Sequence, residues 1–289
     1  MLERTAHPLR GFWNGLASVM NAIFRALGVP GKLLQDLLNG SLLGHSLHGV
    51  LVDVVIGAST AALLLDVLRV VFNVGGLEVA ATWVIGLAWV AGIGAVLTGL
   101  TDFKDTAPDS ATRDVAGMHG AINFVANVGF LVSLVQRLGD NHDLGFWILL
   151  VSYLIISLGS YIGGHIVFKY GYMVNHNAFA RGRRAKHFTP ILAVADLPEE
   201  TPTKATFGTT AVMLVRRGDV VHALKDTCSH AGGPLSDGEL KGDTITCPWH
   251  FSAFRLSDGA VRHGPAGSRQ VSYCARVNDG QVELQGPHD

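Results

Sequence analysis

Two cysteines and two histidines stand at the ends of a polar, glycine-rich stretch toward the carboxyl end of the chain, CSHAGGPLSDGELKGDTITCPWH. The first group is Cys228-Ser229-His230, and the second is Cys247-Pro248-Trp249-His250. Thiolates and imidazoles bind zinc, but zinc sites of this size generally use Cys-x-x-Cys pairs. Here each group supplies one cysteine and one histidine, which favours a two-iron cluster with one iron on the cysteines and the other on the histidines. Zinc is the alternative.

The wider pattern of this region resembles the Rieske [2Fe-2S] domain. The likeness extends through the GGPL run at 232–235, Ser252 and Phe254, and the HGPA run at 263–266. It implies two cluster-binding loops, covered by a proline loop, and a metal-ligand set of Cys228, His230, Cys247 and His250. The residues that the resemblance places around the cluster are Gly232, Pro234, Ser252, Phe254 and Pro265.

Departures from one branch of that family indicate a low-potential cluster. The Rieske proteins of quinol-cytochrome c oxidoreductases carry a disulfide between the loops, where this chain has Gly233 and Trp249. They also place a serine and a tyrosine hydroxyl against the cluster sulfurs, and Phe254 stands at the tyrosine position. Because hydrogen bonds to sulfur favour the reduced cluster, the pattern is more similar to Rieske ferredoxins and oxygenase Rieske domains. An oxygenase subunit is not expected, since only a short segment follows the HGPA run.

The composition predicts a membrane part before this region. The 289 residues are 48% hydrophobic and only 16% charged. Each of four apolar stretches approaches the roughly 20 residues that a helix needs to cross a bilayer, and they lie at 45–71, 80–100, 115–134 and 144–167. The expected fold class is an α-helical transmembrane four-helix bundle followed by a small all-β Rieske domain.

The predicted domains follow from these changes in composition. They are amphipathic, interfacial helices at 1–44, the transmembrane domain at 45–170, a basic linker at 171–189 and the Rieske domain at 190–289. A formal net charge of -1 without a long basic block gives no reason to expect nucleic acid as a partner. Three cysteines are too few for a disulfide framework.

The distribution of lysine and arginine predicts the orientation in the membrane. The side of the bundle that holds both termini receives eleven of these residues, and the other side receives Arg69 and Arg137. By the positive-inside rule, both termini and the Rieske domain are expected in the cytoplasm of a multi-pass cell-membrane protein.

Four histidines are expected at the same end of the up-and-down bundle: His45, His48, His119 and His165. Imidazoles at helix ends serve as polar anchors at the headgroup level, which is the simplest interpretation. Histidines on facing helices are also natural axial ligands of a b-type haem, and a non-haem metal or a quinone pocket would use them too. Among the pairs, His48 with His119 is favoured.

A second resemblance concerns the bundle. GSLLGHSLHGVLVDVVIGA at 40–58, TGLTDFKDT at 98–106 and GSYIGGHIVFKYGYMVN at 159–175 resemble a bacterial four-helix membrane domain of unknown function, which is fused to a Rieske domain in some actinobacteria. That family tends to read His-Pro-Leu-His-Pro where this chain has HSLHG at 45–49. The resemblance supports the topology and says nothing of a substrate.

Together these features predict a membrane-anchored electron-transfer protein. Its cluster would pass single electrons between a soluble donor or acceptor and a haem or quinone in or near the bundle. Two alternatives remain: a redox-sensing or scaffold protein in which the bundle is only an anchor, and a quinone-reactive oxidoreductase.

Overall fold

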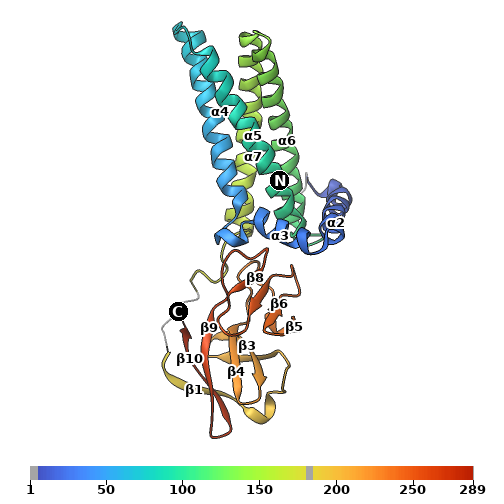
Figure 1. Ribbon diagram of the computed structural model, residues 1–289, viewed down its shortest axis with the longest axis vertical. Coiled ribbons are helices and arrows are strands. Elements are labelled where there is room, and N and C mark those ends of the chain that lie inside the picture. The colour runs from blue at the N-terminus through green and yellow to red at the C-terminus, as the bar shows by residue number, and fades with distance from the viewer. Residues whose placement is uncertain (1–5, 180–184, 289) are drawn as a thin grey trace. The chain divides into compact units, whose positions relative to one another are not determined.

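The computed structural model describes residues 6–179 and 185–288. It contains a helical part followed by a β-rich part (Figure 1). By packing, the chain divides into two compact units. The first comprises the residues up to Gly31 together with Ser46–Tyr170, and the second comprises Lys32–His45 together with the chain from Gly171 onward.

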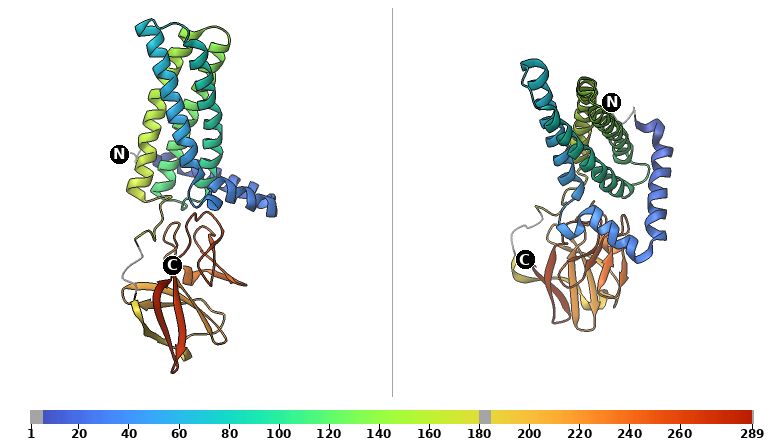
Figure 2. Two further views of the ribbon diagram at one scale, coloured as in Figure 1. Left: turned by 60° about the vertical axis from the view of Figure 1, so that its left-hand side comes forward. Right: turned by 45° about the horizontal axis from the view of Figure 1, so that its top comes forward.

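Eight helices precede the first strand in the described residues. Two are short 3-10 turns, η1 (His7–Leu9) and η2 (Ser41–Leu43). The others are α2 (Arg10–Ala26), α3 (Gly28–Asn39), α4 (Leu47–Phe72), α5 (Glu78–Lys104), α6 (Ala111–Leu138) and α7 (His142–Tyr170). The last four run side by side (Figure 2) and are long and apolar enough to cross a membrane. Four transmembrane helices were predicted, and the fold class is confirmed.

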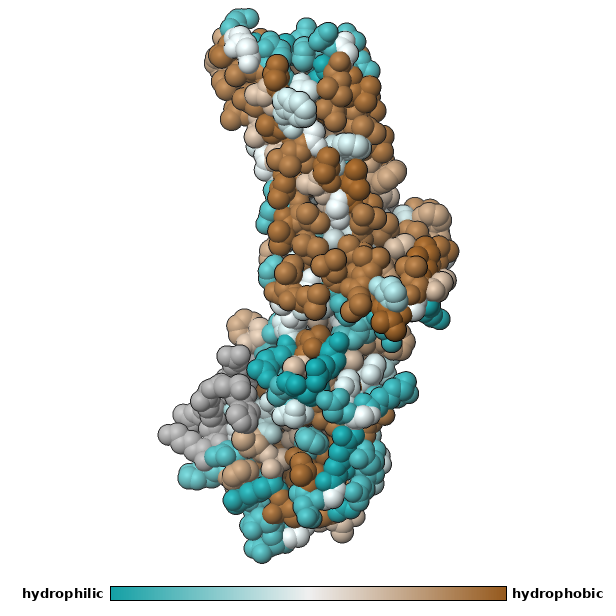
Figure 3. Space-filling model, viewed as in Figure 1, coloured by the Kyte–Doolittle hydropathy of each residue, from teal (hydrophilic) through white to brown (hydrophobic). Residues whose placement is uncertain are grey.

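The bundle is apolar on its outside and packed with small side chains inside. Trp83 is 74% exposed and Phe124 is 57% exposed, whereas Ala62, Ala88 and Ala126 are fully buried. Figure 3 shows a largely hydrophobic surface on the face of these helices that is in view. Because lipid tails are as apolar as leucine, helices in a bilayer associate through close backbone packing at small residues. The chain is therefore a multi-pass membrane protein.

The bundle is built from two helical hairpins. Helix α4 packs along α5, α6 packs along α7, and the hairpins meet mainly through α5 and α6. Helix α2 lies against α5 and α6, where the ring of Trp13 occupies the space that a side chain at Gly117 would need. Arg10 on α2 pairs with Asp114 near the start of α6. This pairing fastens the N-terminal helix to the bundle.

Two antiparallel sheets form the second unit. The larger has the order β1-β10-β9-β4-β3-β2 and the smaller β5-β6-β7-β8. Their bounds are β1 (Ala185–Ala193), β2 (Thr203–Phe207), β3 (Thr210–Arg217), β4 (Val220–Lys225), β5 (Glu239–Lys241), β6 (Thr244–Thr246), β7 (Ala253–Arg255), β8 (Val261–His263), β9 (Ser272–Asn278) and β10 (Gln281–His288), with 3-10 turns η3 (Val194–Asp196) and η4 (Leu235–Asp237). The core between β3, β4 and the small sheet includes Leu224, Ile245 and Phe254.

Part of the N-terminal region packs with the β-rich unit. Asp36 on α3 accepts a 2.7 Å hydrogen bond from the backbone N–H of Gly264, and its other oxygen lies 3.0 Å from His263 Nδ1. Ser41 lies where a side chain at Gly264 would be. Segment 32–45 therefore covers the HGPA run of the β-rich unit. Nothing in the sequence indicated this grouping.

Candidate iron-sulfur site

Each of the two Cys/His groups lies in a loop that follows a strand. Cys228 lies three residues after β4, and Cys247 directly follows β6. Both loops close on themselves in the same way. The N–H of Cys228 donates to the carbonyl of Gly233 and that of Cys247 to the carbonyl of Ser252, five residues on in each case, at 2.8 and 2.9 Å.

The two loops also share a left-handed residue at the same position. In the first loop, Gly232 has φ 83° and its N–H donates to the Cys228 carbonyl at 3.0 Å. In the second, Phe251 has φ 64° and its N–H donates to the Cys247 carbonyl at 3.1 Å. A non-glycine residue in this conformation is uncommon and costs about 1–3 kcal/mol. Phe251 thus takes a strained conformation that gives the second loop the shape of the first.

The turns bring the two thiols together inside and the two imidazoles together further out. Cys228 and Cys247 belong to one buried core and are each 1% exposed. The rings of His230 and His250 have centroids 5.0 Å apart. His230 is buried and lies against the ring of Tyr172, whereas His250 is half-buried.

Backbone N–H groups are aimed at both sulfurs. Those of His230 and Ala231 point at Cys228, and those of Trp249 and His250 point at Cys247. A hydrogen bond from the Cys228 thiol lowers the pKa of Cys247 to about 7, and the N–H groups of its own loop act in the same direction. The same thiol contact, followed by burial, raises the pKa of Cys228. The N–H groups of both loops therefore favour negative charge on the sulfurs, whereas burial opposes it.

A [2Fe-2S] cluster fits this donor set better than a zinc ion does. Among the residues that the structure describes, no three histidine, cysteine or acidic side chains converge as they would around a single metal ion. Two irons need only two protein ligands each, one pair of thiolates and one pair of imidazoles. The geometry supplies these two pairs, together with the N–H groups that a negatively charged cluster requires.

The other residues expected around the site lie near its loops. Ser252 is fully buried, and its hydroxyl accepts a 3.0 Å hydrogen bond from the N–H of Ala266, beside the buried Pro265. Phe254 is fully buried in the same core as both cysteines. Pro234 forms an isolated antiparallel β-bridge with Thr227. A Cβ on Gly233 would lie 2.8 Å from the Cys247 sulfur and 2.9 Å from Trp249 Cγ.

Two supporting residues had no signal in the sequence. Gln270 is 1% exposed; its side-chain oxygen accepts from the N–H of Ser229, and its amide donates to the carbonyls of Lys225 and Thr227. Asn177 donates to Gln270 and to the same Thr227 carbonyl, both at 3.0 Å. These bonds hold the first loop from elements distant in sequence, which no local motif can indicate.

Comparison with known proteins places this site in a family. The Rieske [2Fe-2S] domain matches residues 187–274. The anthranilate 1,2-dioxygenase ferredoxin subunit of Burkholderia cepacia is 30% identical over 95 residues, which cover 33% of this chain and 88% of that protein. The chain belongs to the Rieske [2Fe-2S] family. The ferredoxin CarAc of Metapseudomonas resinovorans is 31% identical over 97 residues. These residues cover 33% of the present chain and 91% of CarAc.

Two further matches concern the β-rich unit and the bundle. The ferredoxin of carbazole 1,9a-dioxygenase from Nocardioides aromaticivorans aligns in structure with a TM-score of 0.33 and 28% identity, covering 36% of this chain and all of that one. The bundle matches a second family, a predicted membrane protein domain known as DUF2231, over residues 44–176. Both predicted resemblances are confirmed, and the chain joins a membrane domain to a Rieske domain.

The structure separates the four bundle histidines. The rings of His48 and His119 have centroids 6.3 Å apart. His165 lies instead against Tyr170 on its own helix, with ring centroids 5.7 Å apart. His45 falls in the second unit.

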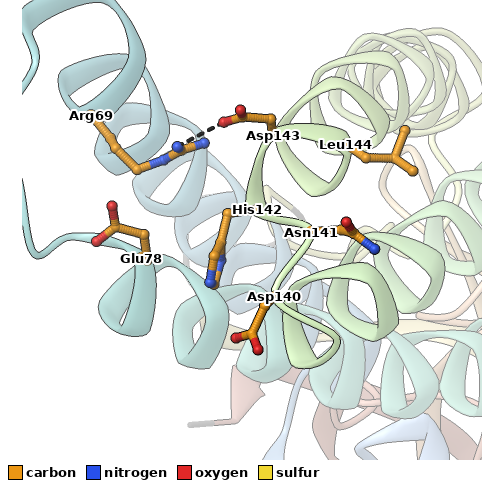
Figure 4. A pocket seen from close by; sticks show the side chains of 7 residues that line it. All are labelled: Arg69, Glu78, Asp140, Asn141, His142, Asp143 and Leu144. Atoms are coloured by element: carbon orange, nitrogen blue, oxygen red, sulfur yellow. Dashed lines mark hydrogen bonds and ion pairs between the residues drawn. The ribbon is translucent and has the colours of Figure 1, made fainter.

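A polar pocket of about 300 Å3 lies at the opposite end of the bundle (Figure 4). It is lined by Arg69, Glu78, Asp140, Asn141, His142, Asp143 and Leu144. Arg69 donates to Asp143 at 2.8 Å. Asp66, three residues before Arg69 on α4, pairs with the fully buried Arg137. These contacts link α4 to α6 and α7, so the simplest role of the charges is to tie the two hairpins together.

Proposed function

We propose that this chain is a membrane-anchored Rieske electron carrier that exchanges single electrons with a soluble cytoplasmic partner and with a second redox centre in its bundle, a haem or a quinone. The observation that carries the proposal is the pairing of two buried thiols and two adjacent imidazoles, with N–H donors aimed at both sulfurs. Relatives that match this domain over most of their length include the ferredoxin subunit of anthranilate 1,2-dioxygenase and the ferredoxin CarAc.

We assign the cluster ligands as Cys228, His230, Cys247 and His250. The cluster, when bound, supplies one-electron chemistry without a bond being made or broken in a substrate. The residues of the chain set its potential and its exposure. N–H groups from both loops favour the reduced, more negative state, while burial of both cysteines disfavours added charge. Of the two histidines, the half-buried His250 offers the shorter route to a soluble partner.

The orientation supports a cytoplasmic partner. Eleven lysines and arginines flank the side of the bundle from which the chain runs into the Rieske unit, against two on the other side. By the positive-inside rule, this bias supports a cytoplasmic location for the unit. A reporter fused after Asp289 should be accessible only from the cytoplasmic face of the cell membrane.

Low-temperature EPR of the full chain in detergent tests the proposal. After reduction with dithionite, the wild-type protein should give the rhombic signal of a Rieske centre. Cys228→Ser and Cys247→Ser should abolish it, because each removes a ligand of the same iron. Cys274→Ser is the matched control, since Cys274 lies apart on β9. A signal that survives either ligand change would show that the assignment is wrong.

A further inference from the structure

The two hairpins of the bundle repeat one arrangement around a histidine. His48 on α4 and His119 on α6 are each followed by glycine, in the runs LHG and MHG. His48 Nδ1 lies 2.9 Å from the carbonyl oxygen of Ala95 on α5, and His119 Nδ1 lies 2.8 Å from that of Gly159 on α7. Each first helix of a hairpin thus anchors its imidazole on the backbone of the second.

A glycine one turn beyond each carbonyl makes room for the ring. A Cβ on Gly99 would lie 2.9 Å from His48 Cε1, and a Cβ on Gly163 would lie 2.8 Å from His119 Cε1. Real Cβ atoms do not approach other atoms this closely, so both rings need glycine at these positions. The two halves therefore hold their imidazoles by the same contacts.

These contacts fix the state of both rings. A carbonyl oxygen only accepts hydrogen bonds, so Nδ1 carries the proton in each ring, and in the neutral imidazole Nε2 keeps its lone pair. Metal-binding histidines almost always donate their other ring N–H to a carbonyl, carboxylate or water in this way. Asn123, one turn after His119, donates to the His119 carbonyl at 2.9 Å, and its amide nitrogen lies 3.1 and 3.3 Å from the two ring nitrogens.

The distance between the rings matches a metal held from both sides. A metal-nitrogen bond of about 2.0 Å, plus about 1.1 Å from nitrogen to ring centre, puts two opposed imidazole centroids about 6.2 Å apart. The observed separation of His48 and His119 is 6.3 Å.

The small number of protein ligands indicates which type of metal the pair could hold. Among the described residues, no third histidine, cysteine or acidic side chain converges with this pair on one ion. A site with two axial imidazoles suits a metal that brings its other four ligands, as haem iron does. The sequence has no C-x-x-C-H motif for covalent attachment of haem.

We propose that His48 and His119 are the axial ligands of a single b-type haem shared by the two hairpins. This inference rests on the proposed function, because it names the second redox centre. His48 and His119 would hold the haem, which when bound would supply a one-electron acceptor: one electron would leave the reduced cluster and reduce the ferric haem iron to the ferrous state.

The test uses the full chain, produced in cells supplied with a haem precursor and purified in detergent. The pyridine haemochrome assay should find one haem b per chain. His48→Ala and His119→Ala should each lose the haem while keeping the Rieske EPR signal, which shows that the Rieske unit has folded, and the helical circular dichroism of the wild type, which shows that the bundle has folded. His142→Ala and His165→Ala are controls and should keep the haem.

A second pair of variants tests the glycines. Gly99→Ala and Gly163→Ala should lower haem occupancy at least tenfold, and by similar factors, because the added methyl group displaces the imidazole. Gly57→Ala on α4, where a Cβ meets nothing within 4 Å, should have no effect. If the glycine variants bind haem like the wild type, the described site is wrong.

The ferric EPR spectrum reports the ring orientation. The two imidazole planes lie at 82°, so the haem should give a low-spin signal with one large g value, as perpendicular axial imidazoles do, and not the rhombic signal of parallel ones. A rhombic signal would overturn the assigned geometry.

The outcomes separate this inference from the proposed function. An intact cluster signal with no haem, or with zinc or quinone alone, overturns the inference and leaves the electron carrier in place. Haem retained in His48→Ala or His119→Ala overturns the ligand pair. Haem present in a chain that lacks the Rieske signal supports the inference and sinks the proposed function.

Discussion

Replacing Ser252 by alanine should lower the potential of the cluster and loosen the loop that covers it. Its buried hydroxyl accepts the N–H of Ala266, so its own hydrogen is available for a cluster sulfur, as the family resemblance implies. A hydrogen bond to sulfur strengthens as the cluster gains an electron. If it contributes about 1.5 kcal/mol more to the reduced state, its loss lowers the midpoint potential by about 60 mV for a one-electron couple.

The same change leaves the Ala266 N–H without its acceptor. A buried, unsatisfied N–H costs about 1–3 kcal/mol, so the amide of Ala266 should also exchange faster with solvent. An EPR-monitored redox titration of the full chain measures the potential. Ser272→Ala, which removes a buried hydroxyl on β9, is the control and should leave the potential unchanged. An unshifted or higher potential in Ser252→Ala, with an intact EPR signal, would refute the placement of this hydroxyl.

Three other changes test the Rieske unit. Phe254→Tyr should raise the midpoint potential by about 60 mV in the same titration, because it adds a hydroxyl donor within the core that holds both cysteines; a lower value would contradict this. Gly233→Ala should reduce the iron content of the purified chain severalfold, since the new Cβ would lie 2.8 Å from the Cys247 sulfur. The guanidinium of Arg255 holds the pKa of Asp258 well below its usual range. The Asp258 carboxylate therefore stabilises the folded state at pH values above its unfolded pKa, and this stabilisation is lost as the pH falls through its folded pKa. Asp258→Asn should therefore lower the protection of β7 amides from exchange at pH 7 and have less effect at pH 2, which lies below the unfolded pKa; equal effects on protection at both pH values would exclude the ion pair as the cause.

Local patterns in the sequence were enough for the architecture, and they also predict a ligand set. Spacing of cysteine and histidine pointed to Cys228 and His250 because each loop must supply one ligand of each kind. Apolar length predicted four spans, and the helices extend beyond them, as α5 does to Lys104, because polar residues at the ends still complete helical turns.

Contacts between distant segments were beyond such patterns. Gln270 and Asn177 hold the first loop through side-chain amides that look like ordinary surface residues in the sequence. The left-handed Phe251 gave no signal either, since glycine is the usual residue there. Hydropathy placed several histidines at one end of the bundle, but the rotation of each helix decides which of them meet, and only the structure shows that His119 faces His48.

Rapid mixing of the full chain with a soluble, reduced one-electron donor tests most directly whether electrons pass from the partner through the cluster into the bundle. We predict that the haem Soret band shifts to its reduced position after the cluster is reduced, and that Cys247→Ser slows haem reduction at least tenfold while haem content is unchanged. If the haem is reduced equally fast without the cluster, the Rieske domain is not the entry point for electrons, and the account is wrong.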